Sequence, residues 1–194
     1  MPALDLSKSS LAVIDMQRYF LEEDAQAYLG APKQLVTNVL ALIGAFRGAA
    51  RPIVFTRHAH AKGSETGEMG RWWDGRLPFE GERQSELIDD LEPASGERLI
   101  TKVRYSAFEG TDLDAWLRER DVDTLVVCGV MTNLCVETTA RHAFMKNLQP
   151  VIAEDACASS DSKYHKASIM NLEYGFAFIE STDSIRKILK GAKR

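Results

Sequence analysis

The stretch Thr124-Leu-Val-Val-Cys-Gly129 is the most strand-like segment of this 194-residue chain. It is a continuous apolar run rich in β-branched residues, which is typical of a strand that is buried on both of its faces. Such strands occur in parallel sheets that are covered by helices on each side. We therefore expect this segment to lie at the centre of a parallel sheet.

Strand-like and helical segments alternate on both sides of this central run. Strand patterns cover residues 11–15, 52–56, 97–101, 124–129, 150–153 and 176–180. The spacing of apolar residues predicts helices at 32–46, 112–120, 135–147, 161–174 and 182–189. Six strands that alternate with helices indicate an α/β fold with a doubly wound parallel sheet, because crossovers between parallel strands are right-handed. We predict that residues 1–194 form one domain.

Residues 58–84 interrupt this alternation, since they show no clear period and contain several glycines. A loop of this length in a compact domain is usually functional or a lid. We predict that one of Trp72 and Trp73 packs on the core and that the other faces a substrate. An arginine of the same loop, Arg71 or Arg76, is expected to bind a carboxylate.

The overall composition excludes several classes of protein. Hydrophobic residues make up 45% of the chain and charged residues 27%, which are the proportions of a globular protein. A net charge of −4 argues against a nucleic-acid-binding surface. No apolar run approaches the roughly 18 residues that a membrane span requires. We therefore expect neither nucleic acid nor a membrane as a partner.

Several short motifs are absent from the chain. The N-terminal sequence lacks the charged and then apolar pattern of a signal peptide, and the three cysteines have no CxxC spacing. We therefore expect a cytoplasmic protein without a disulfide framework or a zinc ribbon. No GxGxxG follows the first strand and no P-loop motif occurs, which argues against dinucleotide and P-loop sites.

Three reactive side chains follow the carboxyl ends of predicted strands. Asp15 ends the first strand, Lys102 follows the third, and Cys135 lies at the predicted start of a helix after the fourth. Taken singly, they are typical of a loop acid, a solvated lysine and a small core residue. Taken together, they supply a base, a cation and a nucleophile at the edge where parallel sheets bind ligands. A helix N-terminus is expected to lower the pKa of the thiol, and the set indicates acyl transfer.

Three segments carry a resemblance to a known family. They are residues 11–17 (LAVIDMQ), 102–108 (KVRYSAF) and 129–144 (GVMTNLCVETTARHAF), with a weaker match at Glu154-Asp-Ala and His165. In order and spacing they resemble the isochorismatase-like, nicotinamidase-related cysteine hydrolases across nearly the whole chain. The resemblance implies a three-layer α/β/α sandwich with six parallel strands in the order 3-2-1-4-5-6. The first and fourth strands are then neighbours at the switch point of the sheet.

The resemblance also implies a reaction. Cys135 would attack a carbonyl carbon to form a thioester, Asp15 would act as general base and then acid, and Lys102 would orient the pair. A cis peptide is implied between Val130 and Met131, with the Met131 and Cys135 N–H groups aimed at the oxyanion. Each such donor can contribute roughly 3–4 kcal/mol to transition-state stabilisation. The thiol favours hydrolysis of an amide, ureido or carbamoyl C–N bond with release of ammonia.

Two other functions remain open at this point. An isochorismatase-type hydrolase of a carboxylated vinyl ether would need Asp15 but not Cys135. A non-catalytic, oligomeric member of the family would need neither, and the intact set of three residues argues against it. Members of the family are commonly dimers, tetramers or octamers, so the resemblance also implies a homo-oligomer.

His58 and His60 follow the second strand, where nicotinamidases hold a metal ion. Two histidines with one residue between them on an extended segment point to opposite sides, and a catalytic zinc takes three protein ligands. We therefore expect no metal and no required cofactor, and we assign His58 a contact with the substrate. The aromatic residues that follow the candidate catalytic segments are expected to line the same pocket or to join the core: Tyr19, Phe20, Tyr105 and Phe108.

Overall fold

The computed structural model describes residues 4–31 and 33–191. It contains a six-stranded sheet in the order β3-β2-β1-β4-β5-β6, and every pair of neighbouring strands is parallel. The strands are β1 (Ser9–Ile14), β2 (Ile53–His58), β3 (Arg98–Lys102), β4 (Thr124–Val130), β5 (Gln149–Ala158) and β6 (Phe178–Glu180). The predicted fold class and strand order are therefore confirmed.

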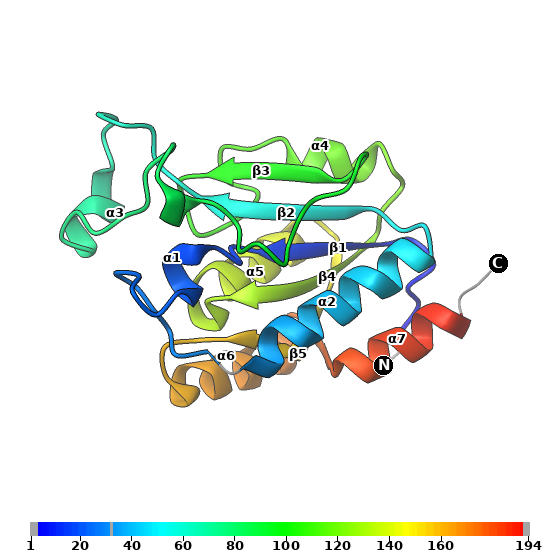
Figure 1. The fold of residues 1–194 in the computed structure, drawn as a ribbon. Coiled ribbons are helices and arrows are strands. Elements are labelled where there is room, and N and C mark those ends of the chain that lie inside the picture. The colour runs from blue at the N-terminus through cyan, green and yellow to red at the C-terminus, as the bar shows by residue number, and fades with distance from the viewer. Residues whose placement is uncertain (1–3, 32, 192–194) are drawn as a thin grey trace.

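Helices cover both faces of this sheet (Figure 1). The helices of the described residues are α1 (Arg18–Leu21), α2 (Lys33–Gly48), α3 (Gly67–Trp72), α4 (Leu113–Arg118), α5 (Glu137–Met145), α6 (Ser162–Gly175) and α7 (Thr182–Gly191). Helices α2 and α7 pack on one face, and α4, α5 and α6 pack on the other. Within the described residues, none of the helices is long and apolar enough to cross a bilayer.

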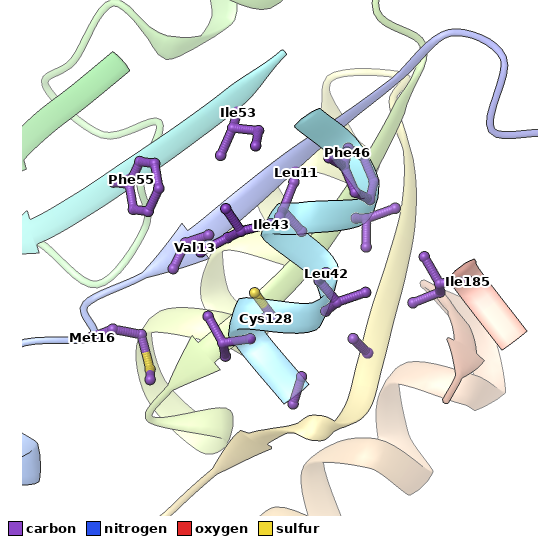
Figure 2. Close-up of a cluster of buried hydrophobic side chains, with 14 of the residues drawn as sticks. Leu11, Val13, Met16, Leu42, Ile43, Phe46, Ile53, Phe55, Cys128 and Ile185 are labelled. Carbon is purple, nitrogen blue, oxygen red and sulfur yellow. The ribbon is translucent and has the colours of Figure 1, made fainter. Parts of the chain in front are cut away.

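Alternate residues of each strand pack into two separate cores. In β1, Leu11 and Val13 join the core beneath α2 and α7, which Figure 2 shows, whereas Ala12 and Ile14 join the opposite core. All six positions of β1 and all seven of β4 are buried. Burial on both faces explains why these strands have continuous apolar sequences without alternation.

The structure differs from the sequence prediction at β5. This strand continues to Ala158, beyond the predicted end at residue 153. The exposed polar residues Glu154 and Asp155 end the apolar pattern but not the strand. The carboxylate of Asp155 accepts hydrogen bonds from the N–H and the hydroxyl of Thr182, so it anchors the start of α7.

The predicted long loop also contains regular structure. Residues 58–84 include the short helix α3 and most of a 3-10 turn at Arg83–Ser85. In addition, the polypeptide after β4 forms a π-helical turn at Thr132–Val136 before α5 begins. The sequence had indicated that Cys135 begins a helix. In the structure, Cys135 instead lies inside this irregular turn.

Strands β1 and β4 approach each other very closely at Gly129. This glycine has a φ of +113°, and a Cβ atom placed on it would lie 2.1 Å from the carbonyl oxygen of Ile14. Only glycine fits this position, because any side chain would meet the backbone of β1. The contact brings the end of β4 against Asp15, which itself has a φ of 46°.

We predict that Gly129→Ala destabilises the protein by at least about 3 kcal/mol or prevents folding, because it adds a backbone collision to the cost of a positive φ. Gly30→Ala is the matched control, since Gly30 has a φ of +60° and no atom within 4 Å of the added Cβ. That variant is expected to lose only about 1–2 kcal/mol. Urea unfolding measures both, and equal losses would contradict the role assigned to Gly129.

Candidate active site

Asp15, Lys102 and Cys135 meet at the carboxyl edge of the sheet. The Lys102 Nζ atom donates to Asp15 Oδ2 at 2.7 Å and to Cys135 Sγ at 3.3 Å. The side chains of Lys102 and Asp15 have no solvent exposure. Lys102 ends β3 and reaches Asp15 across the intervening strand β2. The structure therefore brings together the three residues that the sequence singled out.

Thr56 completes the surroundings of the carboxylate. Its Oγ1 donates to Asp15 Oδ1 at 2.6 Å, while the Asp15 N–H donates to the Thr56 carbonyl at 3.2 Å. Lys102 Nζ also donates to the carbonyl of Arg104 at 3.1 Å. Each carboxylate oxygen thus has a donor of its own. Thr56 was not predicted as a site residue, although its place at the end of the second predicted strand puts it at the same edge of the sheet.

Burial and two neighbouring charges set the pKa of the Cys135 thiol. Burial raises the pKa of Cys135 far above its usual value, and the negative charge of Asp15 acts in the same direction, against the smaller opposing effect of Lys102. For Lys102, burial lowers the pKa, but the negative charge of Asp15 and the hydrogen bonds to Asp15 and Cys135 outweigh it and raise the pKa overall. The resting site is therefore a neutral thiol beside an ion pair. Burial therefore acts against the lowering of the thiol pKa that was expected from a helix N-terminus.

The segment before Cys135 has an unusual backbone. The peptide bond between Val130 and Met131 is cis, at the position that the family resemblance implies. The Met131 carbonyl then accepts from the N–H groups of Leu134 at 3.1 Å and Val136 at 3.2 Å, which closes the π-helical turn. The two expected oxyanion donors, the N–H groups of Met131 and Cys135, belong to this turn and its entrance; their role stays a prediction.

A cavity of about 260 Å³ opens beside Cys135. Its volume is below the about 300–1,000 Å³ of sites for drug-sized ligands, so it fits a small substrate. Aromatic side chains form much of its wall: Tyr19, Phe20, Tyr28, Trp73 and Tyr105.

Comparison with known proteins agrees with this geometry. The family model "Isochorismatase domain" matches residues 9–184. The chain belongs to the isochorismatase family. Nicotinamidase 3 of Arabidopsis thaliana is 37% identical over 94% of this chain and 89% of its own length. The ureidoacrylate amidohydrolase RutB of Yersinia enterocolitica is 29% identical over 94% of this chain and 89% of its own.

Solved structures give the same result. A cysteine hydrolase from Pseudomonas syringae superposes with a TM-score of 0.93 at 28% identity, over 99% of this chain and 97% of that one. The N-carbamoylsarcosine amidase from Thermoplasma acidophilum has a TM-score of 0.81 at 31% identity, over 91% and 97% of the two chains. Since these relatives are hydrolases, this member of the isochorismatase family is a hydrolase too.

Several residues that were expected to contact the substrate or to line its pocket do line the cavity of this hydrolase: Tyr19, Phe20, His58, Trp73 and Tyr105. Trp73 is held in place because its Nε1 donates to the Tyr105 hydroxyl at 2.9 Å. Phe108 instead joins the core beneath α4, α5 and α6.

Trp72 and Arg71 do not line the cavity. Trp72 is 78% exposed, and Arg71 forms an exposed ion pair with Glu68. The reason is α3, since successive side chains at a helix end point about 100° apart and only Trp73 turns toward the cavity. Arg76, the alternative arginine named above, lines the cavity in place of Arg71.

His58 and His60 are closer than their spacing in the sequence suggested. Their Nε2 atoms lie 3.2 Å apart and both residues are buried, because β2 ends at His58 and His60 forms an isolated bridge with Phe79. The expectation that the two rings point apart is therefore wrong. Burial, with a further contribution from Lys102, lowers the pKa of His58 to about 3.

The two histidines provide only two metal ligands. Among the residues that the structure describes, no group of three or more His, Cys, Asp or Glu side chains is placed to hold a metal ion. His165 lies outside the cavity and contacts the π-helical turn, where its Nδ1 is 2.9 Å from the hydroxyl of Thr132.

Gln17 ends the segment 11–17 that carries the family resemblance, and it is fully buried. Its Nε2 donates to the carbonyls of His58 at 2.9 Å and Ser85 at 2.7 Å, and its Oε1 accepts from the His58 N–H at 2.7 Å. Gln17 therefore fixes the backbone of His58 against the end of the 58–84 segment.

We predict that His58 stays neutral in the folded protein down to about pH 3, because its folded pKa of about 3 lies below the value of 6.5 for an unperturbed histidine. Between pH 6.5 and about 3 only the unfolded state binds this proton. The contribution to the free energy of unfolding is complete above pH 6.5 and falls as the pH drops, by up to about 1.4 kcal/mol per pH unit.

Urea unfolding over this pH range, compared with His58→Asn, isolates the contribution. The variant should show a shallower loss of stability on acidification. NMR of the ring protons gives a direct check, and a His58 resonance that titrates near pH 6.5 would contradict the assignment.

Proposed function

We propose that this hydrolase cleaves a C–N bond of a small amide, ureido or carbamoyl compound through a thioester on Cys135, and releases ammonia. The observation that carries this proposal is the contact of the Cys135 thiol with the buried pair of Lys102 and Asp15 at the edge of a small cavity. Relatives named as a nicotinamidase, a ureidoacrylate amidohydrolase and an N-carbamoylsarcosine amidase support the choice of a C–N bond.

In the first half-reaction, the sulfur of Cys135 attacks the carbonyl carbon while Asp15 takes the thiol proton. The carbonyl π electrons move to the oxygen, where the N–H groups of Met131 and Cys135 are the proposed donors. When the C–N bond breaks, Asp15 returns the proton to the nitrogen and ammonia leaves. The acyl group then remains on the sulfur as a thioester.

In the second half-reaction, water attacks the thioester and Asp15 takes a proton from it. The C–S bond breaks, the sulfur regains that proton, and the acid product is released. Lys102 remains protonated throughout and stabilises negative charge as it forms on the sulfur, because its Nζ donates to both Sγ and the carboxylate.

This scheme needs a general base and not a preformed thiolate. The raised pKa of Cys135 keeps the thiol protonated near neutral pH. Asp15 is suited to remove that proton because Thr56 and Lys102 hold its two oxygens in a fixed orientation. The proton transfer then takes place within a preorganised site, which costs little reorganisation during the reaction.

The proposed reaction uses only side chains and backbone groups of this chain. We therefore propose that it requires no cofactor or metal, and that a chelator leaves the rate unchanged. The homo-oligomer and the cytoplasmic location that the sequence indicates stay predictions.

We predict cysteine-dependent release of ammonia from at least one compound of a panel. The panel contains nicotinamide, maleamate, N-carbamoyl amino acids, ureidoacrylate-like compounds and biuret-like compounds. Cys135→Ala should lower kcat by at least about 10⁴-fold, and Asp15→Asn by about 10²–10⁴-fold, because they remove the nucleophile and the general base. Steady-state ammonia assays with and without a chelator measure this.

Cys157→Ala is the matched control, since Cys157 is also a buried free cysteine but does not line the cavity. It should keep activity within about twofold of the wild type, as expected for a change away from the site. Undiminished turnover by Cys135→Ala would refute the thioester scheme. Hydrolysis of a vinyl ether that survives Cys135→Ala but not Asp15→Asn would favour the isochorismatase-type reaction.

A further inference from the structure

Arg76 is the one cationic side chain among the described residues that line the cavity beside Cys135, and no Asp or Glu lines it. Asp15, although close to the thiol, is fully buried and is not part of the lining. The other candidate for positive charge, His58, is neutral because burial lowers its pKa to about 3. Lys102 lies behind the thiol and is paired with Asp15, so the unpaired charge on the cavity wall is positive and comes from Arg76.

The guanidinium of Arg76 is oriented but not neutralised. Its Nε donates to the carbonyl of Trp73 at 3.1 Å. Within the described part of the chain, no carboxylate lies within ion-pair distance of it, and its Nη1 and Nη2 atoms make no hydrogen bond. The guanidinium is fixed at its Nε and keeps two free NH2 groups, which are suited to the bidentate binding of a planar anion.

Hydrogen bonds also fix the backbone around Arg76. The hydroxyl of Tyr19 donates a hydrogen bond to the Arg76 carbonyl at 2.9 Å. The Trp73 carbonyl accepts from the guanidinium, and the Trp73 indole N–H donates to the Tyr105 hydroxyl. The segment is thus attached to the cavity wall at two points. Such preorganisation reduces the entropy lost when a ligand binds.

In the part of the chain that the structure describes, the remaining wall offers no second cationic side chain for an anion. The neighbours of Arg76 in the cavity are mostly aromatic and aliphatic side chains, including Phe20, Leu29, Leu77 and Leu134. An unpaired carboxylate is strongly disfavoured in such surroundings.

We infer that the substrate carries a carboxylate in addition to its scissile C–N bond, and that Arg76 binds this carboxylate. The inference rests on the proposed C–N hydrolysis and narrows its substrate class to small amido or ureido acids. Arg76 is a specificity-determining residue in this account and takes no part in bond breaking.

Two matched pairs of compounds test the inference. Maleamate is compared with cis-crotonamide, and N-carbamoylglycine with N-ethylurea, because a methyl group replaces the carboxylate in each pair. In the wild type, kcat/KM should be at least about 10-fold higher for the carboxylated member of a pair. Arg76→Gln should raise KM for that member by about 10- to 100-fold, as expected for lost hydrogen bonds to a charged group, and leave kcat within about twofold.

Two further variants separate charge recognition from a structural effect. Arg76→Lys should recover part of the lost affinity because it restores the charge without the fork. Arg71→Gln is the matched control on the same loop, since Arg71 is exposed and paired with Glu68, and its KM should equal that of the wild type. An unchanged KM in Arg76→Gln, or a wild-type preference for the neutral compounds, would overturn the inference.

Binding to an inactive enzyme distinguishes this inference from the proposed function. In the Cys135→Ala background, calorimetry should show binding of maleate and N-carbamoylglycine that weakens about 10- to 100-fold with Arg76→Gln. Failure of the carboxylates to bind, or binding that ignores Arg76, overturns the carboxylate site even if neutral amides are hydrolysed. Carboxylate binding through Arg76 without any cysteine-dependent release of ammonia supports the site and refutes the proposed function.

Discussion

The ion pair of Lys102 and Asp15 is the interaction on which the rest of the site depends. Two charges without solvent contact carry a large desolvation cost, which their attraction offsets only when further hydrogen bonds satisfy both groups. Thr56 and the carbonyl of Arg104 supply those bonds, and the thiol of Cys135 takes another from the lysine. Removal of either charge would leave the other buried and unpaired, so the pair constrains folding and chemistry at once.

The strand order explains how this pair and the thiol come together. Asp15, Lys102 and Cys135 follow or end β1, β3 and β4, and all three strands present their carboxyl ends at one edge of the sheet. The close approach at Gly129 draws the end of β4 against β1, and the π-helical turn then directs Cys135 toward the lysine. The fold thus places a base, a cation and a nucleophile without requiring them to be near in sequence.

The sequence predicted the features that depend on regular patterns. Continuous apolar runs located the central strands. Asp15, Lys102 and Cys135 were found because they follow the carboxyl ends of predicted strands. Features that depend on local backbone turns were not predictable in this way. Spacing alone placed His58 and His60 on opposite sides, although the end of β2 brings their rings together. Composition alone did not reveal α3, which turns Trp73 inward and Trp72 outward, or the degree of burial that raises the pKa of Cys135.

The most direct test of this account is mass spectrometry of the enzyme after rapid acid quench during turnover of a substrate amide. We predict an adduct equal to the substrate minus ammonia on the peptide that contains Cys135, and none on the peptides that contain Cys128 or Cys157. Such an adduct is the thioester itself. Release of ammonia at the full rate while Cys135 stays unmodified at every quench time, and continued turnover by Cys135→Ala, would contradict the account.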